Sequence, residues 1–152
     1  MSLDVSVSAD GVRSPLGRAR IADVARVALR SEGVRHALLS ITLLSPRGIA
    51  AMNRQHLNHA GPTDVISFGF ARIGDADPVV GDIYIAPEVA AANARAAGVP
   101  AREEIARLVV HGVLHVLGHD HPDEGREQST MWQRQERHLR SALRALDRDR
   151  TR

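Results

Sequence analysis

Residues 111–121 read His-Gly-Val-Leu-His-Val-Leu-Gly-His-Asp-His, and this stretch holds four of the eight histidines of the chain. His111 and His115 are four residues apart, so on a helix both rings project from one face and can reach a single metal ion. Gly118 follows at a position where glycine can take the left-handed conformation that ends a helix. The chain can then reverse and bring His121 to the same ion. The spacing therefore predicts three imidazole ligands and an open position for water, as in catalytic zinc sites.

Two neighbouring residues leave alternatives for the details of this site. His119 is a rival third ligand, because on an unbroken helix it would extend the same four-residue spacing. We prefer His121, because Gly118 should end the helix before that spacing continues. Asp120 could accept a hydrogen bond from a ligand imidazole and so orient it, and a role in the turn is the alternative. We expect one zinc ion per chain; nickel or another divalent metal is also compatible with three imidazoles.

The residue after the first histidine bears on the reaction. One class of zinc peptidases has the same histidine and glycine spacing but carries a glutamate at this position as general base. Here the position is Gly112, which cannot accept a proton. A hydroxide on the metal can attack without a neighbouring base, because metal coordination lowers the pKa of water to about 7. We therefore expect a metal hydroxide as the nucleophile of a hydrolytic reaction, and hydrolysis of a peptide or a small molecule is one alternative for the bond that is cut.

The composition is that of an ordinary folded domain lacking two kinds of reactive side chain. The chain has 152 residues, 43% of them hydrophobic, so we expect one domain over residues 1–152. The absence of cysteine excludes thiolate metal sites, and the absence of lysine excludes Schiff-base chemistry. No apolar run approaches the roughly 18 residues that cross a bilayer, and the first ten residues do not resemble a secretory signal. We expect a cytoplasmic protein with no membrane association.

Charge is unevenly distributed although the net charge is only +2. Residues 62–104 carry seven acidic side chains and three arginines, whereas residues 134–152 carry seven arginines and three acidic side chains. We interpret the arginine-rich end as a solvated helix with a frayed terminus, and contact with phosphates is the alternative.

Alternating strand and helix signals predict an α/β (α+β) domain, in which a small sheet of about four strands packs with about five helices, including a zincin-like three-histidine metal helix. The predicted strands cover residues 4–8, 37–44, 64–70 and 81–86, the second of them of the buried type. Serine-proline pairs predict helix starts at Ser14 and Ser45. The predicted helices cover residues 14–31, 45–58, 87–97, 101–117 and 123–146.

The histidine stretch resembles the H-G-x-L-H-x-x-G-Y-D-H signature of the YbeY family, bacterial metal-dependent endoribonucleases that act in ribosomal RNA maturation. Three further segments resemble the family in the same order along the chain: Pro62–Phe68, Gly81–Ile83 and Ala86–Val89. The resemblance implies an endoribonuclease that acts on single-stranded RNA in 16S rRNA 3′ end maturation and ribosome quality control. It implies ribosomal RNA and components of the small ribosomal subunit as partners, and His111, His115 and His121 as zinc ligands. The oligomeric state stays open.

The chain departs from the family pattern before the Pro62–Phe68 segment. The family usually has an arginine there, in a segment that aligns with His56-Leu57. Leucine cannot contact a phosphate, so we expect Arg54, one helical turn earlier, to take that role with His56 beside it. A non-catalytic ribosome assembly factor that keeps its metal for stability is the alternative that Leu57 favours.

Three other residues receive structural interpretations. Asp64 is predicted to be a turn or strand-edge residue and not part of a second metal site. Met131 and Trp132 follow the last histidine by about ten residues, and we expect both to pack in the core from the last helix.

Overall fold

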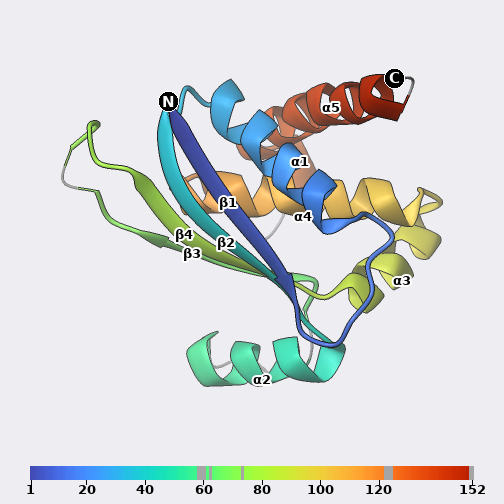
Figure 1. The fold of residues 1–152 in the computed structure, drawn as a ribbon. Coiled ribbons are helices and arrows are strands. Elements are labelled where there is room, and N and C mark those ends of the chain that lie inside the picture. Colours follow the sequence, from blue (N-terminus) through green and yellow to red (C-terminus); the bar gives the residue numbers. More distant parts are fainter. Residues whose placement is uncertain (58–60, 62, 73, 122–124, 151–152) are drawn as a thin grey trace.

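The computed structural model describes residues 1–57, 61, 63–72, 74–121 and 125–150 and builds one mixed sheet with helices on both faces (Figure 1). The strand order is β1-β2-β4-β3, with β1, β2 and β4 parallel and β3 antiparallel at one edge. The strands are β1 (Ser2–Ala9), β2 (His36–Leu43), β3 (Val65–Phe70) and β4 (Val79–Ile85). The α-helices are α1 (Arg18–Ser31), α2 (Pro46–Leu57), α3 (Pro87–Ala97), α4 (Ala101–Val116) and α5 (Thr130–Arg150). The predicted fold class, four strands with five helices, is confirmed in the described part of the chain.

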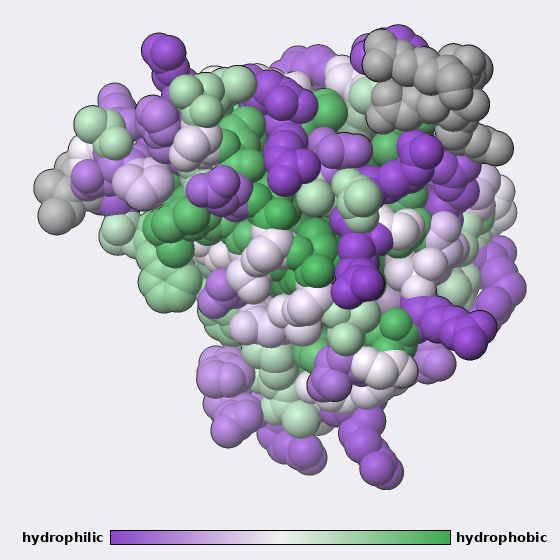
Figure 2. Space-filling model, in the orientation of Figure 1, coloured by the Kyte–Doolittle hydropathy of each residue, from purple (hydrophilic) through white to green (hydrophobic). Residues whose placement is uncertain are grey.

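The helices divide into two unequal layers (Figure 1). On one face α1, α4 and α5 pack on one another, and α1 and α4 also contact strands of the sheet. On the other face α2 lies near one end of the sheet and buries Ile49 against Ile66 of β3. The outer side of α2 is hydrophilic in Figure 2, in agreement with the exposure of Arg47, Arg54 and His56.

Strand β2 shows that the sheet is covered mainly on one side. Its buried side chains alternate along the strand and belong to the main core: Ala37, Leu39, Ile41 and Leu43. Between them Leu38 is 50% exposed. The prediction of a fully buried strand is therefore wrong for its outward-facing side, because α2 covers only one end of the second face.

Two glycines on neighbouring strands bring the end of α4 unusually close to the sheet. Gly69 of β3 pairs with Gly81 of β4. A Cβ atom at Gly69 would lie 2.5 Å from the carbonyl oxygen of Val116, and one at Gly81 would lie 2.5 Å from the Val116 side chain. Only the missing side chains allow this approach, which fixes the position of the helix end that precedes the histidine turn.

The predicted start of α1 is wrong, and α5 begins later than predicted. Helix α1 begins at Arg18 and not at Ser14, because the Ser14 hydroxyl accepts a hydrogen bond from the Leu16 N–H and closes a separate turn. Leu16 enters the core there with 1% exposure. Helix α5 begins at Thr130, after a 3-10 turn over Arg126–Gln128, and the predicted start at residue 123 lies outside the described residues.

The cap of α5 explains its late start, and the cap of α2 confirms a predicted one. Ser129 is extended and its Oγ accepts the N–H of Trp132, so it ends the preceding turn and caps α5. Ser45 Oγ accepts the N–H of Gly48 at 3.0 Å, as the serine-proline pair predicts. In the part of the chain that the structure describes, no helix has the length and apolar character that a membrane crossing needs.

Candidate metal centre

Helix α4 presents two histidines one turn apart and then stops. The ring centroids of His111 and His115 are 4.5 Å apart. Beyond them Gly118 has φ of 97°, and its N–H bonds the His115 carbonyl while the next N–H bonds the Leu114 carbonyl. This pair of bonds is the Schellman arrangement that ends a helix at a left-handed glycine. The predicted helix end at Gly118 is confirmed.

The turn brings a third histidine to the pair. The His121 ring lies 5.3 Å from the His111 ring and 5.1 Å from the His115 ring, measured between centroids. The ligand atoms of the three side chains all lie within 4.8 Å of one another, and no other group of this kind occurs among the described residues. Three imidazole nitrogens in one cluster could hold a metal ion and leave a position for water.

His119, the rival ligand, points elsewhere. Its Nε2 lies 2.7 Å from Oε1 of Glu32, at the end of α1. The other oxygen of Glu32 bonds His138 at 2.7 Å and Arg134 at 3.0 Å, both from α5. Burial alone would raise the pKa of Glu32, but the hydrogen bonds from His138, Arg134 and His119 outweigh it and lower the pKa to about 2. Glu32 is therefore an ionised anchor that holds the histidine turn and α5 to α1.

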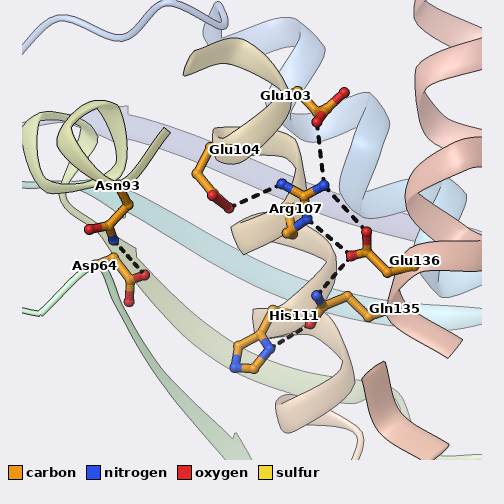
Figure 3. A network of polar contacts seen from close by, with 8 residues as sticks. All are labelled: Asp64, Asn93, Glu103, Glu104, Arg107, His111, Gln135 and Glu136. Carbon is orange, nitrogen blue, oxygen red and sulfur yellow. Dashed lines mark hydrogen bonds and ion pairs between the residues drawn. The ribbon is translucent and has the colours of Figure 1, made fainter. Parts of the chain in front are cut away.

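A buried amide on α5 orients the first histidine (Figure 3). Oε1 of Gln135 lies 2.7 Å from Nδ1 of His111, and Nε2 of Gln135 donates to Glu136 at 3.1 Å. An amide oxygen only accepts, so the proton of His111 sits on Nδ1 and a lone pair is left on Nε2. Arg107 donates through Nε and a terminal nitrogen to the two oxygens of Glu136 and so fixes the far end of the chain of contacts. These contacts select the tautomer that a metal needs.

Burial keeps the two helical histidines neutral. Burial is the main cause that lowers the pKa of His111 from 6.5 to about 4, and the neighbouring His115 and His121 add to it, although the bond to Gln135 opposes it. Burial also lowers the pKa of His115, with His121 as the next cause. At neutral pH both rings are therefore uncharged and offer lone pairs, which metal binding requires.

The comparison with known proteins agrees with this geometry. A family model described as Endoribonuclease YbeY matches residues 12–142. The chain belongs to the YbeY family. It is 33% identical to Endoribonuclease YbeY of Geobacter sulfurreducens, with 93% of this chain and 96% of that protein covered. It is 40% identical to Endoribonuclease YbeY of Carboxydothermus hydrogenoformans, with 81% and 83% covered.

The fold also matches a solved structure. The solution structure of a protein from Thermotoga maritima superposes with a TM-score of 0.66 at 22% identity and covers 95% of this chain and 93% of that one. The resemblance of the histidine stretch to the YbeY signature is thus confirmed at the level of family and fold.

The YbeY-type cluster has no carboxylate directly after its first histidine. Gly112 lies against the sheet, where a Cβ atom would be 2.9 Å from Cγ2 of Ile83. This contact explains the glycine: α4 needs it to pack on β4. The position that supplies a base in zinc peptidases is therefore occupied by a contact between α4 and the sheet.

The other predicted site residues, Asp120, Arg54 and His56, lie outside the group of three histidines. Oδ1 of Asp120 accepts the backbone N–H of His121 at 2.8 Å, so the described contact of this carboxylate is to the turn backbone. Arg54 and His56 lie on exposed positions of α2, and the His56 ring packs edge-on against Phe68 of β3. No described contact joins either residue to the cluster. Leu57 ends α2, and its side chain lies outside the described residues.

Sequence reasoning missed the two polar anchors of this YbeY-family site. Gln135 is 1% exposed, and it occurs four residues after Met131 and four before Leu139, both of them core residues. A polar residue within such an apolar stripe is a signal that could have identified it. Glu32 carries no comparable signal, because its partners are 87 to 106 residues away in the chain.

Of the two core residues predicted near the start of α5, one is confirmed and the other is not. Met131 is buried in the main core, as expected. Trp132 is only half-buried, and it borders a cavity beside His111. The prediction of a core role is wrong for Trp132, because this side chain lies on the wall of that cavity and not in the main core.

Proposed function

We propose that this YbeY-family protein is a single-strand-specific, metal-dependent endoribonuclease that acts in 16S rRNA 3′ end maturation and in ribosome quality control. The observation that carries the proposal is the convergence of three imidazoles, two of them kept neutral by burial, beside a glycine in place of a peptidase base. The family membership supports RNA as the substrate.

His111, His115 and His121 would hold the metal ion, and the donor set fits it because all three offer nitrogen atoms to one point. We propose zinc, with nickel or another divalent ion as the alternative. A divalent ion in such a site polarises a phosphoryl oxygen and supplies a nucleophile from water at neutral pH.

The other residues of the chain position the ligands and the substrate. Gln135 holds the His111 ring in its tautomer, and Asp120 holds the turn that carries His121. We propose that RNA passes from the histidine cluster across the edge strand β3 to α2, where Arg54 and His56 meet the phosphate backbone. Strand β3 contacts both α4 and α2, which supports this path. Exposed arginines of α5 would add further phosphate contacts.

The partners follow from this activity. They are ribosomal RNA and components of the small ribosomal subunit, and the compartment is the cytoplasm.

The test compares substrates and matched variants. Zinc-loaded protein is incubated with a single-stranded RNA, with its duplex form and with casein, and we expect cleavage of the single strand only. His115→Ala should abolish cleavage while the protein still folds, and His36→Ala, an exposed histidine at the start of β2, should not. Hydrolysis of casein would contradict the proposal and indicate that the protein is a peptidase. Binding of RNA without cleavage by the unmodified protein would contradict the proposal and indicate a non-catalytic ribosome assembly factor.

A further inference from the structure

A cavity of about 480 Å³ opens beside His111, between α3, α4 and the start of α5. Its volume lies within the roughly 300–1,000 Å³ of small-molecule sites. Because a proposed metal ligand forms part of its wall, a molecule in the cavity sits next to the histidine cluster. The cavity is therefore the place where the group adjoining the reacting bond would bind.

The wall contributed by α5 carries an aromatic ring. Trp132 lines the cavity, and it also borders a small gap between His111 and His121. It is the one tryptophan of the chain and is half-buried. A flat side chain that is anchored yet reachable is suited to stack on a nucleobase, since every base has a π-face.

Another part of the wall carries hydrogen-bond acceptors, and Figure 3 shows Asn93 and Asp64 pointing toward one another. Nδ2 of Asn93 on α3 donates to Oδ2 of Asp64, which precedes β3, at 3.3 Å. This bond orients the pair, and the second carboxylate oxygen of Asp64 is an acceptor at the cavity wall. A carboxylate matches a base edge that presents adjacent N–H donors, which guanine does with its ring N–H and amino group.

The two arginines of the cavity differ in their freedom to bind an anion. Arg107 is engaged with Glu103, Glu104 and Glu136 and is about 17% exposed, so it is committed to the protein. Arg126 is exposed, and its charge acts on His111 and His115. A phosphate attached to a molecule in the cavity would therefore meet Arg126 on the side of the histidines.

We propose that this cavity is a nucleobase pocket that takes a guanine next to the phosphate to be cut. The base stacks on Trp132 and points its N–H edge at Asp64, and its phosphate lies toward Arg126 and the histidines. The inference rests on the proposed function, because it names the nucleotide that the RNA places beside the metal. The pocket would give the protein a preference for one base, which the three histidines and the arginines of α5 would not provide.

The lone tryptophan provides the test. The zinc-loaded protein is titrated with guanosine 5′-monophosphate and with purine riboside 5′-monophosphate, which has a similar ring face for stacking but lacks the N–H donors. We expect saturable quenching of Trp132 emission by the guanine nucleotide and roughly tenfold weaker binding of the purine riboside. Asp64→Asn should remove that preference, and Asp10→Asn, an exposed carboxylate elsewhere, should retain it.

The outcomes separate this inference from the proposed function. Absence of quenching in a protein that still cleaves RNA overturns the pocket and leaves the endoribonuclease intact. Equal binding of the two nucleotides overturns the guanine assignment. Quenching of Trp132 emission by N-acetyl-arginine amide and not by nucleotides would indicate that the Asp64 carboxylate binds an arginine of a peptide, and it would overturn the proposal. Guanine-selective quenching in a protein that does not cleave RNA supports the pocket while the catalytic proposal fails.

Discussion

The imidazole of His119 donates to Glu32 at 2.7 Å, a bond that spans 87 residues of sequence and fastens the turn before His121 to the end of α1. The same carboxylate accepts from Arg134 and from His138, whose side chain is 5% exposed. One buried anion thus stabilises three elements at once. The position of the third histidine depends on α1, which contributes none of the three histidines.

Loss of this anchor should cost stability. Glu32→Gln removes the charge that the three donors meet, and we expect the free energy of unfolding to fall by about 3 kcal/mol, because breaking a buried pair leaves its partners uncompensated. Glu88→Gln, an exposed glutamate on α3, should change it by less than about 1 kcal/mol. Urea unfolding of both variants measures the difference, and equal losses would show that Glu32 is not an anchor.

The acid limit of stability should depend on the same residue. The pKa of Glu32 is lowered from 4.5 to about 2 in the folded protein. Its contribution is therefore complete above about pH 4.5 and is lost as the pH falls toward 2. The Glu32→Gln protein should lack this part of the pH dependence, which urea unfolding at pH 5, 4 and 3 detects. An unchanged slope between pH 5 and pH 3 in that variant contradicts the assignment.

Metal affinity should depend on Gln135. Gln135→Leu keeps a similar volume but leaves the Nδ1–H of His111 without its acceptor, so we expect metal affinity to fall about 10–100-fold. Gln133→Leu lies on an exposed position of the same helix and serves as the control. Competition with a chromogenic chelator measures both affinities. A loss of the same size in both variants would attribute the effect to the helix and not to the hydrogen bond.

Replacement of each histidine by alanine should identify the ligands. His111→Ala, His115→Ala and His121→Ala should each lower metal affinity by orders of magnitude, and the stoichiometry should be one ion per chain. His119→Ala should retain the metal and lose only the contact with Glu32. Metal analysis after dialysis decides between them, and the opposite result for His119 and His121 would falsify the assignment.

Protons should compete with the metal at lower pH than for an ordinary histidine. The pKa of His111 is lowered to about 4, so the metal-free protein keeps this ring neutral until the pH approaches that value. The contribution of the neutral ring to stability is complete above pH 6.5 and is lost as the pH falls toward 4. The rise in melting temperature on adding metal should therefore shrink from pH 6 to pH 4. A constant rise across that interval excludes imidazole ligation.

The RNA path should be visible in the salt dependence of binding. Arg54→Ala should weaken single-stranded RNA binding for all sequences alike and reduce the log–log salt slope by about 0.7, the release expected for one contact. Arg35→Ala is the control, since Arg35 is exposed before β2, at the end of the sheet opposite α2. Leu57→Arg, which restores the family residue, should raise turnover. Equal slopes for the two arginine variants would remove α2 from the path.

Local chemistry made much of this protein predictable. The spacing of His111 and His115 is a property of any helix, and the left-handed preference of Gly118 acts on its own turn, so both features follow from neighbouring residues. The predicted helix start at Ser14 is wrong because the Ser14 hydroxyl accepts the Leu16 N–H and closes a separate turn, and because Leu16 is buried in a core that residues from distant parts of the chain build. The contact of Gln135 with His111 spans 24 residues and depends on how α5 crosses α4, which no local pattern contains.

The close packing of Gly112 against the Ile83 side chain constrains how this sequence can evolve. A glutamate at residue 112 would give the histidine spacing its peptidase base, but its Cβ would lie 2.9 Å from Cγ2 of Ile83, so that side chain or the helix would have to shift. Enlarging the space by shortening Ile83 alone would leave a void under the metal helix. We therefore expect either change alone to destabilise the protein, so a carboxylate at residue 112 would also require a substitution at Ile83. The packing of α4 on Ile83 thus limits which residues can stand beside the first histidine.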